Sequence, residues 1–130
     1  MDKTIIKRLY GLNKYNIKLG LENISTLLEH LDNPHKRLNT IHIAGTNGKG
    51  STAFFLNSIF NTAGYKTGLY LSPHLIDIRE RIIIGKDWIP EKKFAELTEY
   101  IFCVIEKERL SATFFEFVTA LAFLYFFQEE

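Results

Sequence analysis

The sequence predicts an α/β fold in which helices flank a parallel sheet. Two short apolar runs, Thr40–Ala44 and Thr67–Leu71, have the length and composition of buried strands. The residues between them, from Lys49 to about Ala63, suffice for a helix, and Gly64 follows where a C-terminal cap glycine is common. Strand, helix and strand in this order form a β-α-β unit, which crosses over right-handed into a parallel sheet.

Two helices are predicted before the first strand. The first is short and ends at Gly11, after apolar residues that share one face: Ile5, Ile6, Leu9 and Tyr10. The second runs from about Leu21 to Leu31, because apolar residues recur there at the spacing i, i+3, i+4 and i+7, namely at Ile24, Leu27, Leu28 and Leu31. Asn33-Pro34 then ends the helix.

A hairpin and a long helix are predicted after the second strand. Arg81–Ile84 and Trp88-Ile89 flank the turn residues Gly85-Lys86-Asp87, as expected of a small β-hairpin. Pro90 is typical of a helix start. The helix extends to about Arg109, with apolar residues at helical spacing: Phe94, Leu97, Ile101 and Ile105.

The last predicted helix is apolar on all sides. Thr113 and Glu116 have the spacing of a capping box, and from Phe114 to Phe127 only Glu116 and Thr119 are not apolar. Such a helix must be covered on most faces, and one β-α-β unit offers little to cover it. We therefore expect the 130 residues to be part of a larger fold. On their own they should expose apolar surface and self-associate.

Composition excludes several classes of protein. The net charge of +1 argues against a nucleic-acid partner. The first residues lack the apolar segment of a secretory signal, and the most apolar stretch, Phe114–Phe127, is too short to cross a bilayer. The single cysteine, Cys103, excludes an intramolecular disulfide and fits a reducing compartment. We expect a cytoplasmic protein without a membrane partner.

The segment after the first predicted strand has the order of residues that binds a polyphosphate. Gly45-Thr46-Asn47-Gly48 is a glycine-rich turn, and Lys49-Gly50-Ser51-Thr52 opens the following helix. Glycines let backbone N–H groups approach phosphate oxygens, and the helix N-terminus favours an anion. Lys49 supplies a charge for the outer phosphates, and a hydroxyl at Ser51 or Thr52 can reach a magnesium ion. Asn47 is suited to a left-handed backbone conformation.

The spacing differs from the common pattern G-x-x-x-x-G-K-[ST], because Ile43 stands where its first glycine belongs and Gly50 follows Lys49. Two other hypotheses therefore remain open. The chain could be a kinase or ATPase of another P-loop class, or a self-contained nucleotide-binding module in which the helix Phe114–Phe127 is an oligomerisation face.

The loop and its flanks resemble those of a known enzyme family. Gly45–Thr52 is similar to the ATP loop of the Mur-ligase superfamily. Flanking segments on both sides narrow the resemblance to the N-terminal part of folylpolyglutamate synthase/dihydrofolate synthase. Upstream are Leu19-Gly20-Leu21-Glu22-Asn23-Ile24 and Leu31-Asp32-Asn33-Pro34-His35, and downstream are Leu71-Ser72-Pro73-His74-Leu75 and Arg79-Glu80-Arg81-Ile82. The resemblance covers about Gly20 to Phe127. It implies the P-loop NTPase-like parallel sheet of the Mur-ligase central domain, incomplete in this chain.

The resemblance implies a ligase of folate biosynthesis and one-carbon metabolism. Members use ATP and Mg²⁺ to activate the carboxylate of dihydropteroate or a folate as an acyl phosphate, which the amine of L-glutamate attacks. Full-length members are usually monomeric. Residues 1–130 would be the N-terminal part of the ATP-binding domain, without the C-terminal glutamate-binding domain, and inactive alone.

The resemblance also implies the roles of single residues. Lys49 is the catalytic lysine, and the nucleotide is held by Gly45, Thr46, Asn47, Gly48, Lys49, Gly50, Ser51 and Thr52. Ser51 and Ser72 are the implied magnesium ligands. The implied folate-side residues are Ser72, Pro73, His74, Asp77 and Arg81.

Four polar residues, Arg81 among them, also have less specific interpretations. Arg79 and Arg81 suit carboxylate or phosphate recognition, and a surface salt-bridge run fits them equally well. His42 lies in an apolar strand and is expected to be a packed core histidine. Glu116 is explained by the capping box, without a metal.

Overall fold

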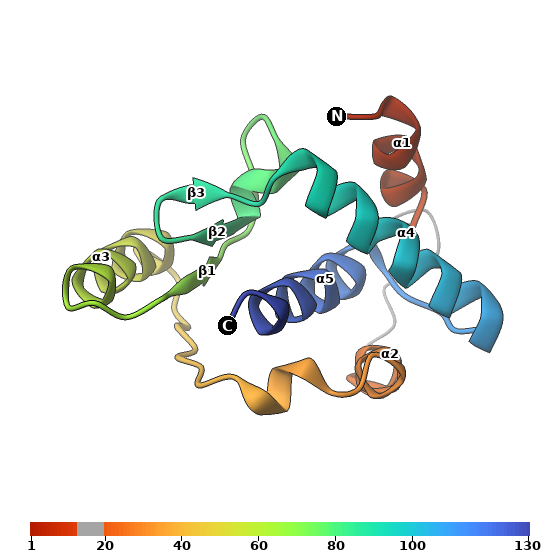
Figure 1. Cartoon of the computed structure of the whole chain (residues 1–130), viewed down its shortest axis with the longest axis horizontal. Helices are drawn as coiled ribbons and strands as arrows, with labels where there is room; N and C mark the ends of the chain where they lie inside the picture. The colour runs from red at the N-terminus through yellow and green to blue at the C-terminus, as the bar shows by residue number, and fades with distance from the viewer. Residues whose placement is uncertain (13–19) are drawn as a thin grey trace. The chain divides into compact units, whose positions relative to one another are not determined.

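The structure is a computed structural model, and it describes residues 1–12 and 20–130 (Figure 1). The chain divides into two compact units. The helical unit comprises Met1–Leu38 and Glu91–Glu129, and the sheet unit comprises Asn39–Pro90.

The helical unit is built around one apolar helix. Its elements are α1 (Lys3–Gly11), α2 (Glu22–His30), the 3₁₀ turn η2 (Pro34–Arg37), α4 (Glu91–Glu108) and α5 (Phe114–Gln128). Helix α5 contacts each of the other four, and it lies between α4 and the α2–η2 segment in Figure 1. Nine residues of α5 are buried. The expectation that the chain could offer little cover for this helix is therefore wrong, because four elements of the same unit contact it.

Local signals place the helices of this unit as predicted. Thr113 and Glu116 form the capping box at the start of α5, with Glu116 Oε2 accepting from the Thr113 N–H at 2.8 Å. Asp2 is the N-cap residue of α1, and its side chain accepts from the Thr4 N–H at 2.8 Å. Helix α2 ends before Asn33, which is left-handed at φ +50°, and Pro34 starts η2.

The sheet unit contains one long helix and a small antiparallel sheet. Its elements are α3 (Lys49–Thr62), β1 (Gly68–Tyr70), the 3₁₀ turn η3 (Ile78–Arg81), β2 (Ile82–Ile84) and β3 (Asp87–Trp88). The strand order is β1-β2-β3, with Leu69 opposite Ile83 and Ile83 opposite Trp88. Gly85 and Lys86 form the predicted hairpin turn, where Gly85 is left-handed at φ +64°.

The α/β composition is as predicted, but the parallel β-α-β unit is not formed. Thr40–Ala44 has no strand conformation, and both pairings of the described sheet are antiparallel. A strand exists only with a hydrogen-bonded neighbour, and β1 takes β2 as that neighbour through a connection, residues 71–81, that contains η3. His42 is exposed, so the expectation of a packed core histidine is wrong.

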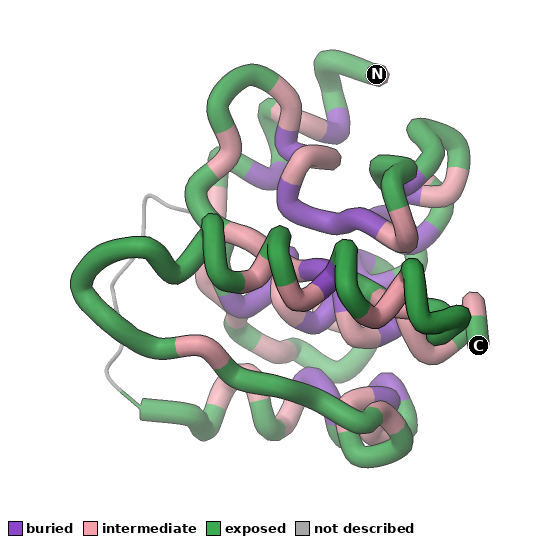
Figure 2. Tube along the Cα trace, turned by 90° about the vertical axis from the view of Figure 1, so that its left-hand side faces the viewer, coloured by how far each residue is buried: buried purple, intermediate pink, exposed green. Residues whose placement is uncertain are grey.

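Helix α3 exposes most of its apolar side chains. Asn57 is its only buried residue, whereas Phe54, Phe55 and Ile59 are 50%, 70% and 62% exposed. Figure 2 colours α3 mostly as exposed or intermediate. Exposed apolar surface thus lies on α3. Among the residues that the structure describes, no helix has both the length and the apolar content needed to cross a membrane.

Candidate functional site

The glycine-rich loop leads directly into α3. Gly48 is the N-cap residue, and its backbone is left-handed at φ +74°. It has no side chain to accept from the first N–H groups of the helix, and the first turn contains no acidic residue. These N–H groups have no partner within the helix, and the helix dipole adds positive potential there. The loop therefore presents donors and positive potential to solvent.

The ammonium group of Lys49 lies over the loop. Its Nζ donates to the carbonyl oxygen of Gly45 at 2.6 Å. An ammonium group has three donors, so this contact leaves others for an incoming oxyanion. The Lys49 side chain therefore folds back over the loop. A phosphate bound there would contact both the Lys49 ammonium group and the backbone N–H groups at the start of α3.

The left-handed position belongs to Gly48 rather than Asn47. The residues with positive φ in the described chain include Gly48 but not Asn47. The expectation that Asn47 supplies this conformation is therefore wrong. A glycine adopts it without the steric cost that a Cβ imposes.

Three hydroxyl groups accompany the loop, at Thr46, Ser51 and Thr52. All three residues are exposed, and Ser51 and Thr52 lie in the first turn of α3. No group of three or more His, Cys, Asp or Glu side chains in the described residues could hold a metal ion. Magnesium commonly binds through substrate phosphates with one or two protein oxygens. The donor set therefore fits an ion that arrives with a nucleotide, not a preformed metal site.

A second polar segment follows β1 in the same unit. Ser72 lies two residues after the end of β1, and the Ser72–Pro73 peptide bond is cis. Both residues are exposed. The segment from here to Arg81 contains the remaining residues that the sequence singles out, and side-chain hydrogen bonds shape it.

His74 and Arg81 contact each other. Arg81 Nε donates to His74 Nδ1 at 2.8 Å, which makes Nδ1 an acceptor and leaves the proton of a neutral imidazole on Nε2. Burial, and then the Arg81 charge, lower the pKa of His74. Arg81 is only 8% exposed, so the alternative of a surface salt-bridge run is wrong for this arginine.

Asp77 is engaged by Arg79 and caps η3. The Arg79 guanidinium donates to Asp77 Oδ2 at 2.8 Å, and the Arg79 N–H donates to Oδ1 at 2.9 Å. The hydrogen bond from the Arg79 side chain is the main reason why the pKa of Asp77 is lowered. Asp77 thus builds the loop, and the same carboxylate is less available to a ligand than the sequence suggested.

Glu80 also shapes this loop, a role that was not predicted from the sequence. Glu80 accepts from the N–H of Asp77 at 2.7 Å and completes a capping box with that residue. Aspartate followed three residues later by glutamate is a capping-box spacing, so the signal was present in Asp77 and Glu80.

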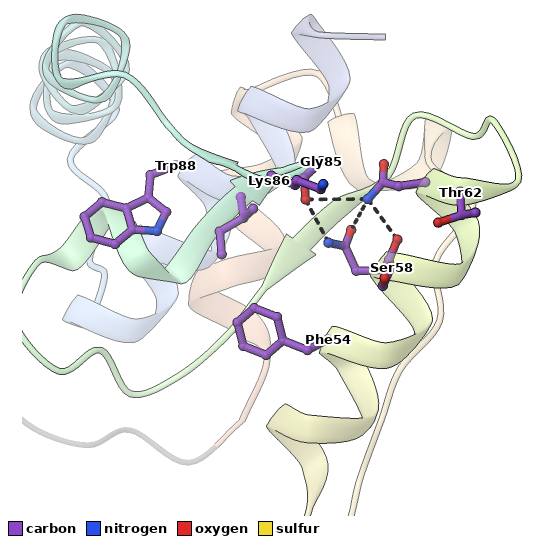
Figure 3. Close-up of a pocket in the computed structure, with 9 residues that line it drawn as sticks. Phe54, Ser58, Thr62, Gly85, Lys86 and Trp88 are labelled. Atoms are coloured by element: carbon purple, nitrogen blue, oxygen red, sulfur yellow. Dashed lines mark hydrogen bonds between the residues drawn. The ribbon is translucent and has the colours of Figure 1, made fainter.

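A cavity of about 380 Å³ lies elsewhere in the sheet unit, between α3 and the hairpin (Figure 3). Asn57 Nδ2 donates to the Gly85 carbonyl at 2.9 Å, and Asn61 Nδ2 donates to the Asn57 carbonyl at 2.8 Å. None of the predicted site residues lines this cavity; its lining comprises Phe54, Asn57, Ser58, Asn61, Thr62, Ile83, Gly85, Lys86 and Trp88. The two asparagines fasten the hairpin turn to α3.

The chain is similar to folate-linked synthases in sequence. It is 39% identical over 111 residues to the dihydrofolate synthetase of Saccharomyces cerevisiae, which covers 85% of this chain and 26% of that protein. It is 36% identical over 122 residues to the dihydrofolate synthase/folylpolyglutamate synthase of Bacillus subtilis, covering 91% of this chain and 28% of that protein. The chain thus spans little more than a quarter of these relatives. No protein-family model matches it.

Solved structures match the fold. The folylpolyglutamate synthase of Thermotoga maritima superposes with a TM-score of 0.89 and 42% identity, over 97% of this chain and 30% of that one. A folylpolyglutamate synthase complex with AMPPCP and folate has a TM-score of 0.92 and 32% identity, over 99% and 33%. A bifunctional folylpolyglutamate synthase/dihydrofolate synthase with Mn, AMPPNP and L-glutamate has a TM-score of 0.86 and 34% identity, over 97% and 30%.

These matches place the chain in the Mur-ligase type of fold. Within that type, it belongs by sequence and structure to the folylpolyglutamate synthase/dihydrofolate synthase family, of which it represents one segment. The resemblance inferred from the loop and its flanks is confirmed.

Proposed function

We propose that this chain supplies the ATP-binding loop and part of the folate site of an ATP-dependent ligase that adds L-glutamate to dihydropteroate or a folate. Residues 1–130 would be the N-terminal part of the ATP-binding domain, with the glutamate-binding domain supplied by polypeptide outside them. The observation that carries the proposal is the loop itself: left-handed Gly48 at the start of α3, with the Lys49 ammonium held over the loop by Gly45.

The chemistry of this proposal balances without a redox partner. A carboxylate oxygen of the substrate bonds to the γ-phosphorus of ATP while the bond to ADP breaks. The glutamate amine then attacks the acyl carbon, phosphate leaves, and the amine loses a proton. Phosphoryl transfer depends mainly on positioning and charge neutralisation. This is the work that a loop of backbone N–H groups and one lysine can do.

Each predicted residue has a place in this proposal. The loop Gly45–Thr52 surrounds the phosphates, and Lys49 stabilises the charge that moves onto the leaving oxygen. Magnesium, when bound with the nucleotide, would neutralise phosphate charge, with Ser51 and Ser72 hydroxyls as its protein ligands. The loop from Ser72 to Arg81 would face the folate-type substrate. We place the protein in the cytoplasm, as its lone cysteine suggests.

Titration calorimetry with Mg-ATP tests the nucleotide part. The wild-type chain should show saturable binding, and Lys49→Ala should weaken it by about tenfold or more, because a charge-assisted contact to phosphate is lost. Lys92→Ala is a matched control, since Lys92 is an exposed lysine of α4 in the helical unit, and it should bind like the wild type. Equal affinity of the Lys49 and Lys92 variants would contradict the proposal.

A further inference from the structure

One carboxylate in the sheet unit organises three consecutive backbone N–H groups. Glu80 Oε2 accepts from the N–H of Leu75 at 3.0 Å, and Glu80 Oε1 accepts from those of Ile76 and Asp77 at 2.9 and 2.7 Å. A capping box needs only the last of these contacts. The other two reach back across the loop and fix residues that belong to no helix or strand.

The residues held in this way have unusual side chains for an exposed loop. Leu75 and Ile76 are 91% and 92% exposed, more than any other large apolar residue among those described. Two adjacent aliphatic side chains in water contribute nothing to the stability of the loop. The polar network that holds them therefore orders a backbone whose side chains point away from the fold.

The rest of the loop restrains the same segment from both ends. Before it, His74 is joined to Arg81, and after it, Asp77 is joined to Arg79. The hydrogen bonds from the three N–H groups also lower the pKa of Glu80, so the carboxylate is ionised at neutral pH and bonds its donors strongly. The loop is thus ordered by its own side chains.

We infer that Glu80 is a positioning residue, which holds the backbone at Leu75 and Ile76 so that their side chains form an apolar contact for the pteridine or aryl part of the folate-type substrate. The inference rests on the proposed function for the identity of that substrate. An aromatic ring system offers flat apolar surface that two aliphatic side chains can cover, and because the backbone that carries them is already ordered, binding costs less conformational entropy. Glu80 itself does not touch the substrate.

The test separates the order of the loop from the contact that it makes. Glu80→Ala removes the acceptor, and the amide hydrogens of residues 75–77 should exchange with solvent about tenfold faster or more, as followed by NMR. Its dissociation constant for pteroic acid should rise by about tenfold, whereas that for Mg-ATP should stay within about twofold of the wild type. Glu80→Gln keeps one oxygen acceptor and should fall between the two.

Two further variants serve as controls. The double variant Leu75→Ala, Ile76→Ala should keep the slow amide exchange and still lose affinity for pteroic acid, because it removes only the contact. Glu96→Gln, at an exposed glutamate of α4 in the helical unit, should change neither measurement.

Each contrary outcome has a distinct meaning. Unchanged amide exchange in Glu80→Ala would overturn the ordering role of Glu80. Faster exchange with unchanged pteroic acid affinity would overturn the positioning role. A folded wild-type chain that binds Mg-ATP but no pteroic acid would overturn the folate contact while leaving the nucleotide part of the proposed function standing.

Discussion

Gly48 and Gly50 are two residues apart, and the structure predicts opposite effects when each becomes alanine. An added Cβ meets no atom within 4 Å at either position, so packing plays no part in the comparison. Gly48 is left-handed at φ +74°, whereas Gly50 lies in the first turn of α3. The difference between the two variants therefore isolates backbone conformation.

Gly48→Ala should destabilise the sheet unit by about 1 kcal/mol, the lower end of the cost of a Cβ in the left-handed region. Gly50→Ala should stabilise it by about 0.5 kcal/mol, because alanine is the better helix former and restricts the unfolded chain. The two variants should thus differ by about 1.5 kcal/mol. With a urea slope of about 2 kcal/mol per molar, their unfolding midpoints should differ by about 0.7 M.

Trp88 provides the assay. It is the single tryptophan of the chain and lies in β3, so its fluorescence during urea unfolding reports on the sheet unit. Equal midpoints for the two variants, or a shift of both in the same direction, would refute the assignment of Gly48 to a left-handed cap. In that case the glycine would be present for a reason other than backbone conformation.

Two more predictions concern the sheet unit. Asn57→Ala removes the hydrogen bond to the Gly85 carbonyl and should lower the free energy of unfolding by about 1–3 kcal/mol in the same fluorescence assay. The control Ser58→Ala should change it by less than about 0.5 kcal/mol. Equal effects of the two variants would show that this hydrogen bond does not stabilise the sheet unit. In the folded loop the pKa of Asp77 is lowered from 3.8 and that of Glu80 from 4.5. Both ionised carboxylates therefore stabilise the folded loop at pH values above 4.5. This contribution is lost as the pH falls through the pKa that each group has in the folded protein. The side-chain carboxyl carbon shifts of Asp77 and Glu80, which report on each carboxylate separately from the neighbouring His74, should therefore have midpoints below pH 3.8 and 4.5 by NMR; a midpoint at or above these values would contradict the lowered pKa of that residue.

The helices, their caps and the hairpin could be read from the sequence because their signals are local. Apolar spacing placed α2 and α4 to within about two residues, and the Thr113–Glu116 spacing placed the start of α5. The turn Gly85-Lys86 needs only a left-handed glycine between two short apolar runs. The proposed phosphate loop could also be predicted from local sequence, because its glycines and lysine lie beside the start of α3.

Apart from the left-handed position, which belongs to Gly48 and not to Asn47, the errors concern partners that are distant in sequence. Thr40–Ala44 has the composition of a buried strand, but an apolar run does not say which neighbour it will pair with, and β1 pairs with β2 instead. The same limit misplaced His42 in a core. For the same reason the sequence did not show what covers α5. The elements that bury it include α1, α2 and η2, which are distant from α5 in the sequence.

The loop from Ser72 to Arg81 has some features that could be predicted from local sequence and others that depend on how the chain folds. Its residues were found in the sequence as candidates for substrate contact, and the spacing of Asp77 and Glu80 was there to be read. That His74 accepts from Arg81, and that one carboxylate gathers three N–H groups, depends on how the chain turns back on itself between β1 and η3. Helix caps, turns and the glycine-rich loop depend on neighbouring residues, so the sequence alone determines them. The pairing of strands and the sharing of the Glu80 carboxylate by three N–H groups depend on which segments meet when the chain folds, so only the tertiary structure decides them.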